Sequence, residues 1–329
     1  MHKQIKTGLT LLVVGCCVGN LPAEFGVSAG GAFNYKARFG STAEMLPRAT
    51  DPGAATAGTD HNYDDGYNRV DSSGNAGGLT SDWGYQNSSQ YNPAGDGTIR
   101  MNSAQTTINP AASSASQDTP QPAISLYWQQ DLTKCEVLNL GVRAAFNWQH
   151  INLDTHALEA TTITTISDTY SLGGVTPPSA PFDGSFLGPN TLLGDDPTRS
   201  ISAVAGPTIL GNRSIDADLF GLDLGPTLSV NITERVRAVV SAGATLAWIR
   251  SDFTYTDGTL ASGSVSDDKA LFGGYAGADL QYRLSETWGV FVGATYTRLE
   301  NFRQQDQGRT AELKFSGCYD IHTGVYFNY

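Results

Sequence analysis

The last seven residues, TGVYFNY (323–329), complete a run in which apolar and polar side chains alternate from Leu313 to the C-terminus. The largely apolar set is Leu313, Phe315, Gly317, Tyr319, Ile321, Thr323, Val325, Phe327 and Tyr329, and the largely polar set between them includes Glu312, Lys314, Asp320 and His322. A period of two is typical of a β-strand with one apolar face. This run of about 17 residues is far longer than the 5 to 6 residues usual in soluble proteins. It predicts a tilted strand that crosses a bilayer with its apolar face in lipid.

The same stretch resembles the C-terminal signal of bacterial outer-membrane barrels. That signal has a polar residue, a glycine, two free positions and then aromatic residues at the third-last and last positions. Thr323, Gly324, Phe327 and Tyr329 match it here. The resemblance is to small eight-stranded barrels of the OmpA, OmpW and OmpX type. It implies insertion by the barrel assembly machinery into the outer membrane of a Gram-negative-type bacterium.

Seven further segments alternate in the same way, at about 25–39, 123–130, 138–149, 220–231, 235–248, 272–283 and 288–296. Short turns connect some of them, and long connections at about 40–122, 150–213, 251–268 and 301–309 connect the others. Outer-membrane barrels have short periplasmic turns and long external loops. We therefore predict an all-β fold, an eight-stranded antiparallel transmembrane β-barrel with long extracellular loops and both termini in the periplasm. Ten strands remain an alternative, because 161–167 is β-prone, and a surface hairpin is expected from 66–71 and 79–85.

The N-terminal segment reads as an export signal. Lys3 and Lys6 precede a short apolar core at 8–18, which is too short to span a bilayer. Cleavage after Ala23 would give residues 1–23 as the signal peptide and 24–329 as the barrel. Lipoprotein processing at Cys16 is the alternative.

Aromatic residues of the predicted strands separate into two groups by height, as expected where rings meet the headgroup layers. The periplasmic group is Trp128, Tyr282, Trp288, Phe327 and Tyr329, and the outer group is Phe39, Trp148, Trp248 and Tyr296.

The inward faces of the strands contain charged side chains of both signs. An eight-stranded barrel has a lumen that side chains fill, and charges buried there must pair. The predicted lumen network is Lys36, Arg38, Arg143, Asp223, Arg237, Asp279, Arg283, Glu312, Lys314 and Asp320.

The expected external loops carry most of the net charge of −12, with nine acidic and three basic residues in 40–122 alone. An acidic surface excludes nucleic acid as a natural ligand, since phosphate binding needs basic residues. Asp60, Asn62, Asp64 and Asp71 follow the spacing of a calcium loop weakly, because Gly66 stands one position too late. No cofactor and no metal site are predicted.

Catalysis is not expected. His150 has Asp154 nearby, but the sequence places no serine nucleophile beside them. Asp320 and His322 share the inward face of one strand, which is typical of buried polar residues that form hydrogen bonds with each other. The first functional hypothesis is a structural or surface-interaction role through acidic loops, with outer-membrane lipid as the surroundings and no particular extracellular ligand predicted. The alternatives are a narrow channel for small solutes or ions and a lipid-A-modifying enzyme.

Overall fold

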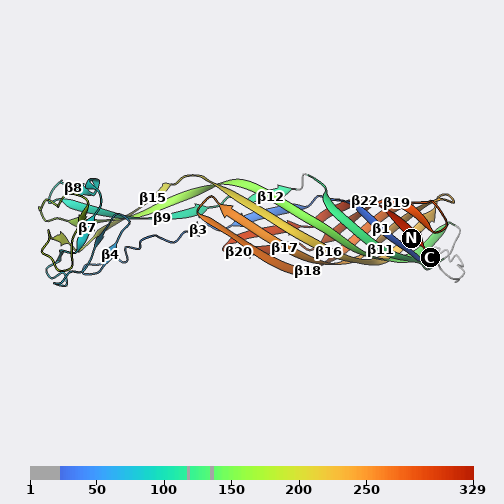
Figure 1. Cartoon of the computed structure of the whole chain (residues 1–329), viewed down its shortest axis with the longest axis horizontal. Coiled ribbons are helices and arrows are strands. Elements are labelled where there is room, and N and C mark those ends of the chain that lie inside the picture. Colours follow the sequence, from blue (N-terminus) through green and yellow to red (C-terminus); the bar gives the residue numbers. More distant parts are fainter. Residues whose placement is uncertain (1–22, 117–118, 134–136) are drawn as a thin grey trace, which may run out of the picture.

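The computed structural model describes residues 23–116, 119–133 and 137–329, nearly all of them in antiparallel β-structure or its connections. The molecule is a long rod, with both chain ends at one tip and a small group of short strands at the other (Figure 1). We call these tips the terminal end and the head end. Among the described residues, no helix is long and apolar enough to cross a membrane. The predicted signal residues 1–22 lie outside the described part of the chain.

Eight strands form a closed ring at the terminal end, which confirms the predicted fold. Each strand pairs antiparallel with two neighbours, and β11 pairs with β12 to close the circle. The ring strands are β1 (Ala23–Phe33), β11 (Gln121–Asp131), β12 (Leu138–Ser171), β16 (Ile209–Asn231), β17 (Val236–Asp257), β18 (Ala261–Arg283), β19 (Trp288–Leu299) and β22 (Ser316–Asn328). Residues 161–167 belong to β12 beyond the ring, so they add no ninth or tenth strand to it.

The outer face of the ring exposes an apolar belt. Leu140, Phe146, Leu222, Leu246 and Phe272 are each 45–61% exposed, although Leu and Phe side chains are usually buried. Such a belt on a closed ring is the face that lipid covers in a membrane barrel.

Beyond the belt the strands continue as a double layer, which we call the collar. Here β12, β16, β17 and β18 face a second sheet of β10 (Ser113–Ser116), β2 (Lys36–Ser41), β21 (Arg309–Lys314) and β20 (Phe302–Asp306). Their facing sides enclose an apolar core that includes Phe39, Ile151, Phe253, Phe302 and Phe315. Residues 251–268 and 301–309, which the sequence predicts as loops, are mostly β-structure: the first lie in the long β17–β18 hairpin and the second in the short β20–β21 hairpin.

Three strands each gain one residue where the ring passes into the collar. Buried residues of one face should be an even number apart, but here they are three apart: Ala32 and Tyr35, Leu299 and Phe302, Phe315 and Cys318. Asn34 (φ 68°) and Gly317 (φ 99°) adopt the left-handed backbone conformation, and the Asn34 side-chain amide donates to the Gly317 carbonyl at 2.7 Å. One extra residue exchanges the two faces of a strand.

The predicted loops 40–122 and 150–213 form a stalk and a head. In the stalk, β12 pairs with β9 (Thr98–Asn109) and β15 (Thr198–Ala205), while β3 (Glu44–Met45) and β8 (Tyr91–Asn92) pair with β9. The head contains β4 (His61–Asn62), β5 (Gly66–Asn68), β6 (Leu79–Thr80), β7 (Trp83–Tyr85), β13 (Phe182–Asp183), β14 (Leu193–Gly194) and the 3₁₀ helix η1 (Ser88–Gln90). Because β5 pairs with β7, the expected hairpin between 66–71 and 79–85 is confirmed.

Candidate functional site

The centre of the barrel lumen holds a chain of charged side chains, which we call the lumen network. Arg143 of β12 forms an ion pair with Asp279 of β18. The imidazole of His322 on β22 lies between two carboxylates, with Nε2 3.0 Å from Asp279 and Nδ1 2.6 Å from Asp320. The guanidinium of Arg143 also lies 3.9 Å from the centre of the Tyr127 ring. Arg143, Asp279 and His322 are buried, so this network joins three strands across the lumen.

A second polar layer closes the terminal end of the lumen. Glu24 of β1 accepts hydrogen bonds from Tyr127 and, at 2.7 Å, from Gln281. Arg237 donates to Asp131 at 2.6 Å and has an amino group 3.7 Å from Glu24. The charged side chains of this layer thus neutralise one another, because an unpaired ion is costly where there is little water.

Very little empty space remains between these layers. The cavity beside the lumen network measures about 30 Å³, which is about the volume that one water molecule occupies in liquid water. Asp223, another predicted lumen residue, lies at this cavity and accepts hydrogen bonds from Asn147 (2.7 Å) and Thr245 (2.6 Å). Above the cavity the apolar collar core continues the filling.

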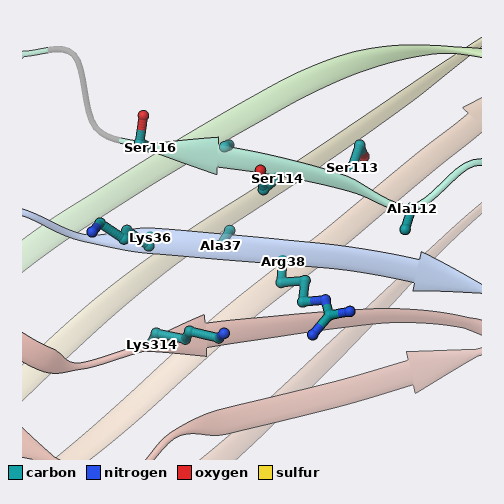
Figure 2. Close-up of a pocket in the computed structure, with 9 residues that line it drawn as sticks. Lys36, Ala37, Arg38, Ala112, Ser113, Ser114, Ser116 and Lys314 are labelled. Atoms are coloured by element: carbon teal, nitrogen blue, oxygen red, sulfur yellow. The ribbon is translucent and has the colours of Figure 1, made fainter.

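The structure brings together only part of the predicted lumen network. Arg143, Asp223, Arg237, Asp279 and Asp320 face the lumen, whereas Arg283 is exposed at the terminal rim and donates to the Glu234 carbonyl. The inward prediction is wrong for the four remaining residues, Lys36, Arg38, Glu312 and Lys314. Their strands carry the extra residues at Asn34 and Gly317, so these side chains point out of the collar. Figure 2 shows Lys36, Arg38 and Lys314 on this face.

Glu24 and Asp131 are lumen carboxylates outside the predicted network, although the alternation of the sequence indicates an inward side chain at both positions. Glu24 shares its parity with inward Gly26 and Ser28, and Asp131 shares its parity with inward Gln129. Both residues lie at strand ends. Because the alternation stops there, the sequence alone does not indicate that these side chains are buried.

The predicted aromatic groups lie at the two edges of the belt, with one exception. Around the terminal end, Trp128, Phe25, Phe327 and Trp288 are successive cross-strand partners, and Tyr282 and Tyr329 are also exposed. Trp248 and Tyr296 are exposed at the opposite edge and Trp148 is half-buried. Phe39 is 1% exposed and stacks on Phe253 inside the collar, with ring centroids 5.9 Å apart. The prediction that Phe39 faces outward is wrong, because the extra residue at Asn34 exchanges the two faces of the strand. The stacked rings of Phe33 and Tyr319 lie on the outer face instead.

The residues that match the C-terminal signal take part in ring closure. β22 pairs with β1 on one side and β19 on the other. The Thr323 hydroxyl donates to the Phe291 carbonyl at 3.0 Å. A Cβ on Gly324 would lie 2.2 Å from the Val27 carbonyl oxygen, so only glycine fits between these strands.

The weak calcium candidate is not assembled as a site. Each of its four residues uses its side-chain oxygen for a separate hydrogen bond: Asp60 with the Val70 amide, Asn62 with the Arg69 guanidinium, Asp64 with the Ala104 amide, and Asp71 with the Ser73 and Ser81 amides. Among the described residues, no group of three or more His, Cys, Asp or Glu side chains is placed to hold a metal ion.

His150 and Asp154 are not partners. The His150 ring lies on the outer face of β12, with Nδ1 3.2 Å from Asp218 and Nε2 3.6 Å from Asp216. Asp154 lies 3.8 Å from His156 instead.

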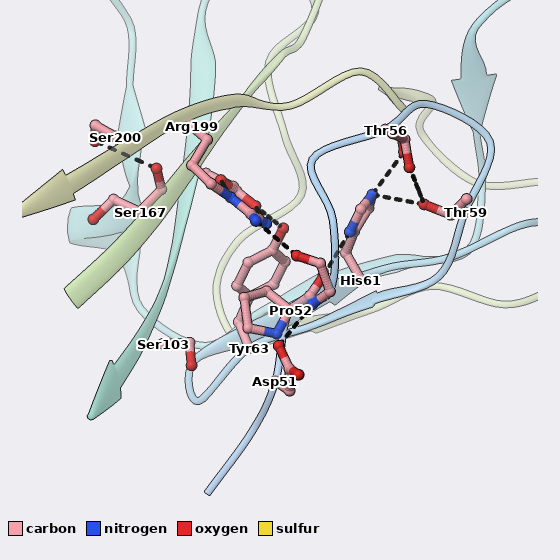
Figure 3. A network of polar contacts seen from close by, with 12 residues as sticks. Asp51, Pro52, Thr56, Thr59, His61, Tyr63, Ser103, Ser167, Arg199 and Ser200 are labelled. Carbon is pink, nitrogen blue, oxygen red and sulfur yellow. Dashed lines mark hydrogen bonds and ion pairs between the residues drawn. The ribbon is translucent and has the colours of Figure 1, made fainter. Parts of the chain in front are cut away.

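A buried polar network fastens the head to the stalk (Figure 3). Arg199 of β15 donates twice to Asp168 of β12, at 2.8 and 2.6 Å. The Tyr63 hydroxyl donates to the same carboxylate at 2.6 Å and lies 2.6 Å from the Tyr170 hydroxyl. Burial alone would raise the pKa of Asp168, but the hydrogen bonds from Arg199 and Tyr63 hold it below its ordinary value. The ionised carboxylate therefore ties residue 63 to two stalk strands.

A second buried cluster, the collar cluster, lies where the collar meets the stalk. Arg213 of β16 contacts Glu159 and Asp257, both at 2.6 Å. Arg309 of β21 forms ion pairs with Asp257 and Glu44. Three carboxyl groups thus share two guanidinium groups. Burial raises the pKa of Glu159 to about 7, with the charge of Asp257 adding to the rise and Arg213 opposing it.

The collar cluster predicts a pH dependence of stability. Because the pKa of Glu159 is about 7 in the folded protein and ordinarily 4.5, the folded chain keeps this proton over a range in which the unfolded chain has lost it. Stability should therefore fall as the pH rises through this range and stay lower above it. Glu159→Gln should remove this decline, which denaturant unfolding in detergent micelles at several pH values can measure. Glu300→Gln, at an exposed position, should keep the wild-type profile. Parallel profiles for Glu159→Gln and wild type would contradict the prediction.

Comparisons with known proteins give structural likenesses without a family. No protein-family model and no curated protein matches the chain. It is similar to the outer-membrane protease OmpT from Escherichia coli, with 10% identity, 97% of this chain and 99% of that chain covered, and a TM-score of 0.37. It is also similar to Ail, the attachment invasion locus protein of Yersinia pestis, with 10% identity, 93% and 99% covered, and a TM-score of 0.29. A third likeness is to the translocator domain of the autotransporter NalP from Neisseria meningitidis, with 12% identity, 94% and 89% covered, and a TM-score of 0.23.

The class assignment rests on the geometry of the chain itself. Eight antiparallel strands close a ring, the outer face of the ring is apolar, and the charged residues of the ring pair inside it. A closed ring leaves no sheet edge unpaired, which is the condition for β-structure in lipid. The chain therefore has the fold of an outer-membrane β-barrel.

Proposed function

We propose that this chain is a closed outer-membrane barrel that holds a β-rich head away from the membrane and acts through contacts of that head. The observation that carries the proposal is the filled lumen. The cavity beside the lumen network is about 30 Å³, and the apolar collar core lies beyond it. A hollow of about 280 Å³ at the terminal end is lined by the second polar layer, including Glu24, Arg237 and Gln281. A hydrated ion or solute needs a continuous polar path, and these layers interrupt one.

The orientation follows from the lengths of the connections. At the terminal end β16 leads to β17 through residues 232–235, and β18 leads to β19 through residues 284–287. The stalk and head lie at the opposite end. Barrels of this class keep short turns in the periplasm and long connections outside. Both termini are then periplasmic and the head is extracellular, with the closing strand presenting Phe327 and Tyr329 to the assembly machinery.

The first test is electrical. The purified full chain, inserted into planar bilayers, should give no stable conductance steps, with a general porin recorded under the same conditions as the positive control. Stable steps that scale with protein concentration would overturn the closed-lumen reading and favour a narrow channel.

The second test addresses the head. A variant can replace residues 46–97 with a link of about ten residues, since that length of extended chain bridges from Met45 to Thr98, and can replace residues 172–197 with a short turn. Cells that display this variant should lose the attachment to surfaces or to one another that the wild-type chain confers, at equal barrel levels by heat-dependent gel mobility. Unchanged attachment would refute the role of the head.

A further inference from the structure

The outward face of the second collar sheet concentrates positive charge in an otherwise acidic protein. Lys36 and Lys314 are direct cross-strand partners on β2 and β21. Arg38 follows on the same face of β2, opposite Ser114 of β10. Like charges placed directly opposite each other destabilise a sheet. This arrangement therefore favours an anion that lies between them.

None of these three cations forms an ion pair with another described residue. Within the described residues, no carboxylate lies within ion-pair distance of Lys36, Arg38 or Lys314. Glu312 of β21 is the direct cross-strand partner of Arg38, but it forms no ion pair with Arg38, and its carboxylate accepts a hydrogen bond from Asn301 at 3.1 Å.

A hollow of about 380 Å³ lies among these side chains. Lys36, Arg38 and Lys314 line it together with Ser113, Ser114 and Ser116 of β10. Figure 2 shows the Lys314 side chain extending along β21 toward Arg38, with the serines on the neighbouring strand. Two ammonium groups, one guanidinium and several hydroxyls are the donor set that recognises a phosphate group.

The height of the hollow indicates where that phosphate comes from. The stacked rings of Phe33 and Tyr319 mark the nearby edge of the apolar belt. Lys36 follows Phe33 by three residues, or roughly 10 Å of extended strand. At the usual strand tilt of about 40° this is roughly 8 Å of height, which is close to the thickness of one headgroup layer, about 5–8 Å.

On the opposite collar face Asp216 and Asp218 are half-buried and Asp252 is exposed. The exposed Arg250 on that face has carboxylate residues, Asp218 and Asp268, as its cross-strand partners.

We infer that Lys36, Arg38 and Lys314, with Ser114 and Ser116 of β10 on the same face, form a site for the phosphate group of an outer-leaflet lipid headgroup. A phosphate bound there would hold the lipid at the outward face of the second collar sheet. This inference rests on the barrel fold and is independent of the role proposed for the head.

The test measures lipid binding by the full chain in detergent micelles. Wild type should bind phosphatidic acid, which carries a terminal phosphate, about tenfold or more tightly than zwitterionic phosphatidylcholine. The triple variant Lys36→Gln, Arg38→Gln, Lys314→Gln should lose this preference. The matched control Arg100→Gln, Arg250→Gln, Lys269→Gln removes the same charge at exposed positions elsewhere and should keep it.

Heat-dependent gel mobility checks that each variant is folded, and all six positions are exposed or half-buried. Equal loss of preference in both triple variants would overturn the site in favour of a general charge effect. Retained preference in the Lys36, Arg38, Lys314 variant would also overturn it. Inorganic phosphate is the third arm, and its binding as tightly as phosphatidic acid would overturn the assignment to lipid.

Discussion

Deletion of Gly317 is expected to prevent assembly of the barrel. Without the extra residue, Leu313 and Phe315 would turn out of the collar core, and Glu312 and Lys314 would turn into it. Each displaced large apolar side chain costs about 1.5–3 kcal/mol, and an unpaired buried charge costs several kcal/mol. The sum is comparable with the roughly 5–15 kcal/mol that stabilise a typical fold.

Two measurements check this result: the heat-dependent shift in gel mobility and the amount recovered in the outer-membrane fraction. The matched control is deletion of Gly95, which also has a positive φ (63°) but lies in the loop between β8 and β9, where a Cβ at this residue would have no neighbouring atom within 4 Å. That deletion should leave barrel assembly intact. Wild-type levels of folded protein after deletion of Gly317 would show that the two faces of β21 are not fixed by this residue.

Replacement of Arg143 by alanine should destabilise the barrel by about 3–5 kcal/mol, the usual cost of removing one partner from a buried ion pair. Arg143 neutralises Asp279 in the lumen network and covers the Tyr127 ring. Its loss leaves Asp279 with the imidazole of His322 alone, and His322 already serves Asp320. Denaturant unfolding of the full chain in detergent micelles measures the change.

Arg283→Ala is the informative control for Arg143→Ala. Sequence parity assigns both arginines to the lumen, but Arg283 is exposed at the rim. Its replacement should change stability by no more than about 0.5 kcal/mol, as surface substitutions usually do. A double variant, Arg143→Met with Asp279→Leu, should lose less than Arg143→Ala, because it leaves no unpaired charge. Equal losses for Arg143→Ala and Arg283→Ala would show that the lumen network contributes little.

The alternation of apolar and polar residues predicts which way side chains face only where the surroundings of the strand stay the same. Alternation in 123–130, 138–149 and 272–283 reflects two environments, lipid outside and polar side chains inside, and the structure keeps both along those strands. The same rule fails above Phe33 and Tyr319. There the outside becomes polar and the inside becomes apolar, so the alternation continues in reverse, and Lys36 and Phe39 exchange the faces that their spacing predicts.

The long connections illustrate a different limit. Residues 150–171 look irregular because β12 leaves the collar and enters the stalk, where β9 and β15 pair with it on its two edges. Stalk and head strands such as β5 and β7 are only three residues long, and a period of two cannot be recognised in so few residues. Their stability comes from partners far away, as when Asp168 receives hydrogen bonds from Tyr63 and Arg199.

The sequence by itself determined the features that depend on local periodicity and composition. These are the eight ring strands, the apolar outer belt, the closing strand that ends in Phe327 and Tyr329, and the acidic composition of the long connections. Tertiary structure alone decided which charges meet, because Arg143 and Asp279 are 136 residues apart. It also decided which face Lys36, Arg38 and Lys314 occupy. A single extra residue hardly changes a sequence pattern, yet it turns every following side chain of a strand to the opposite side.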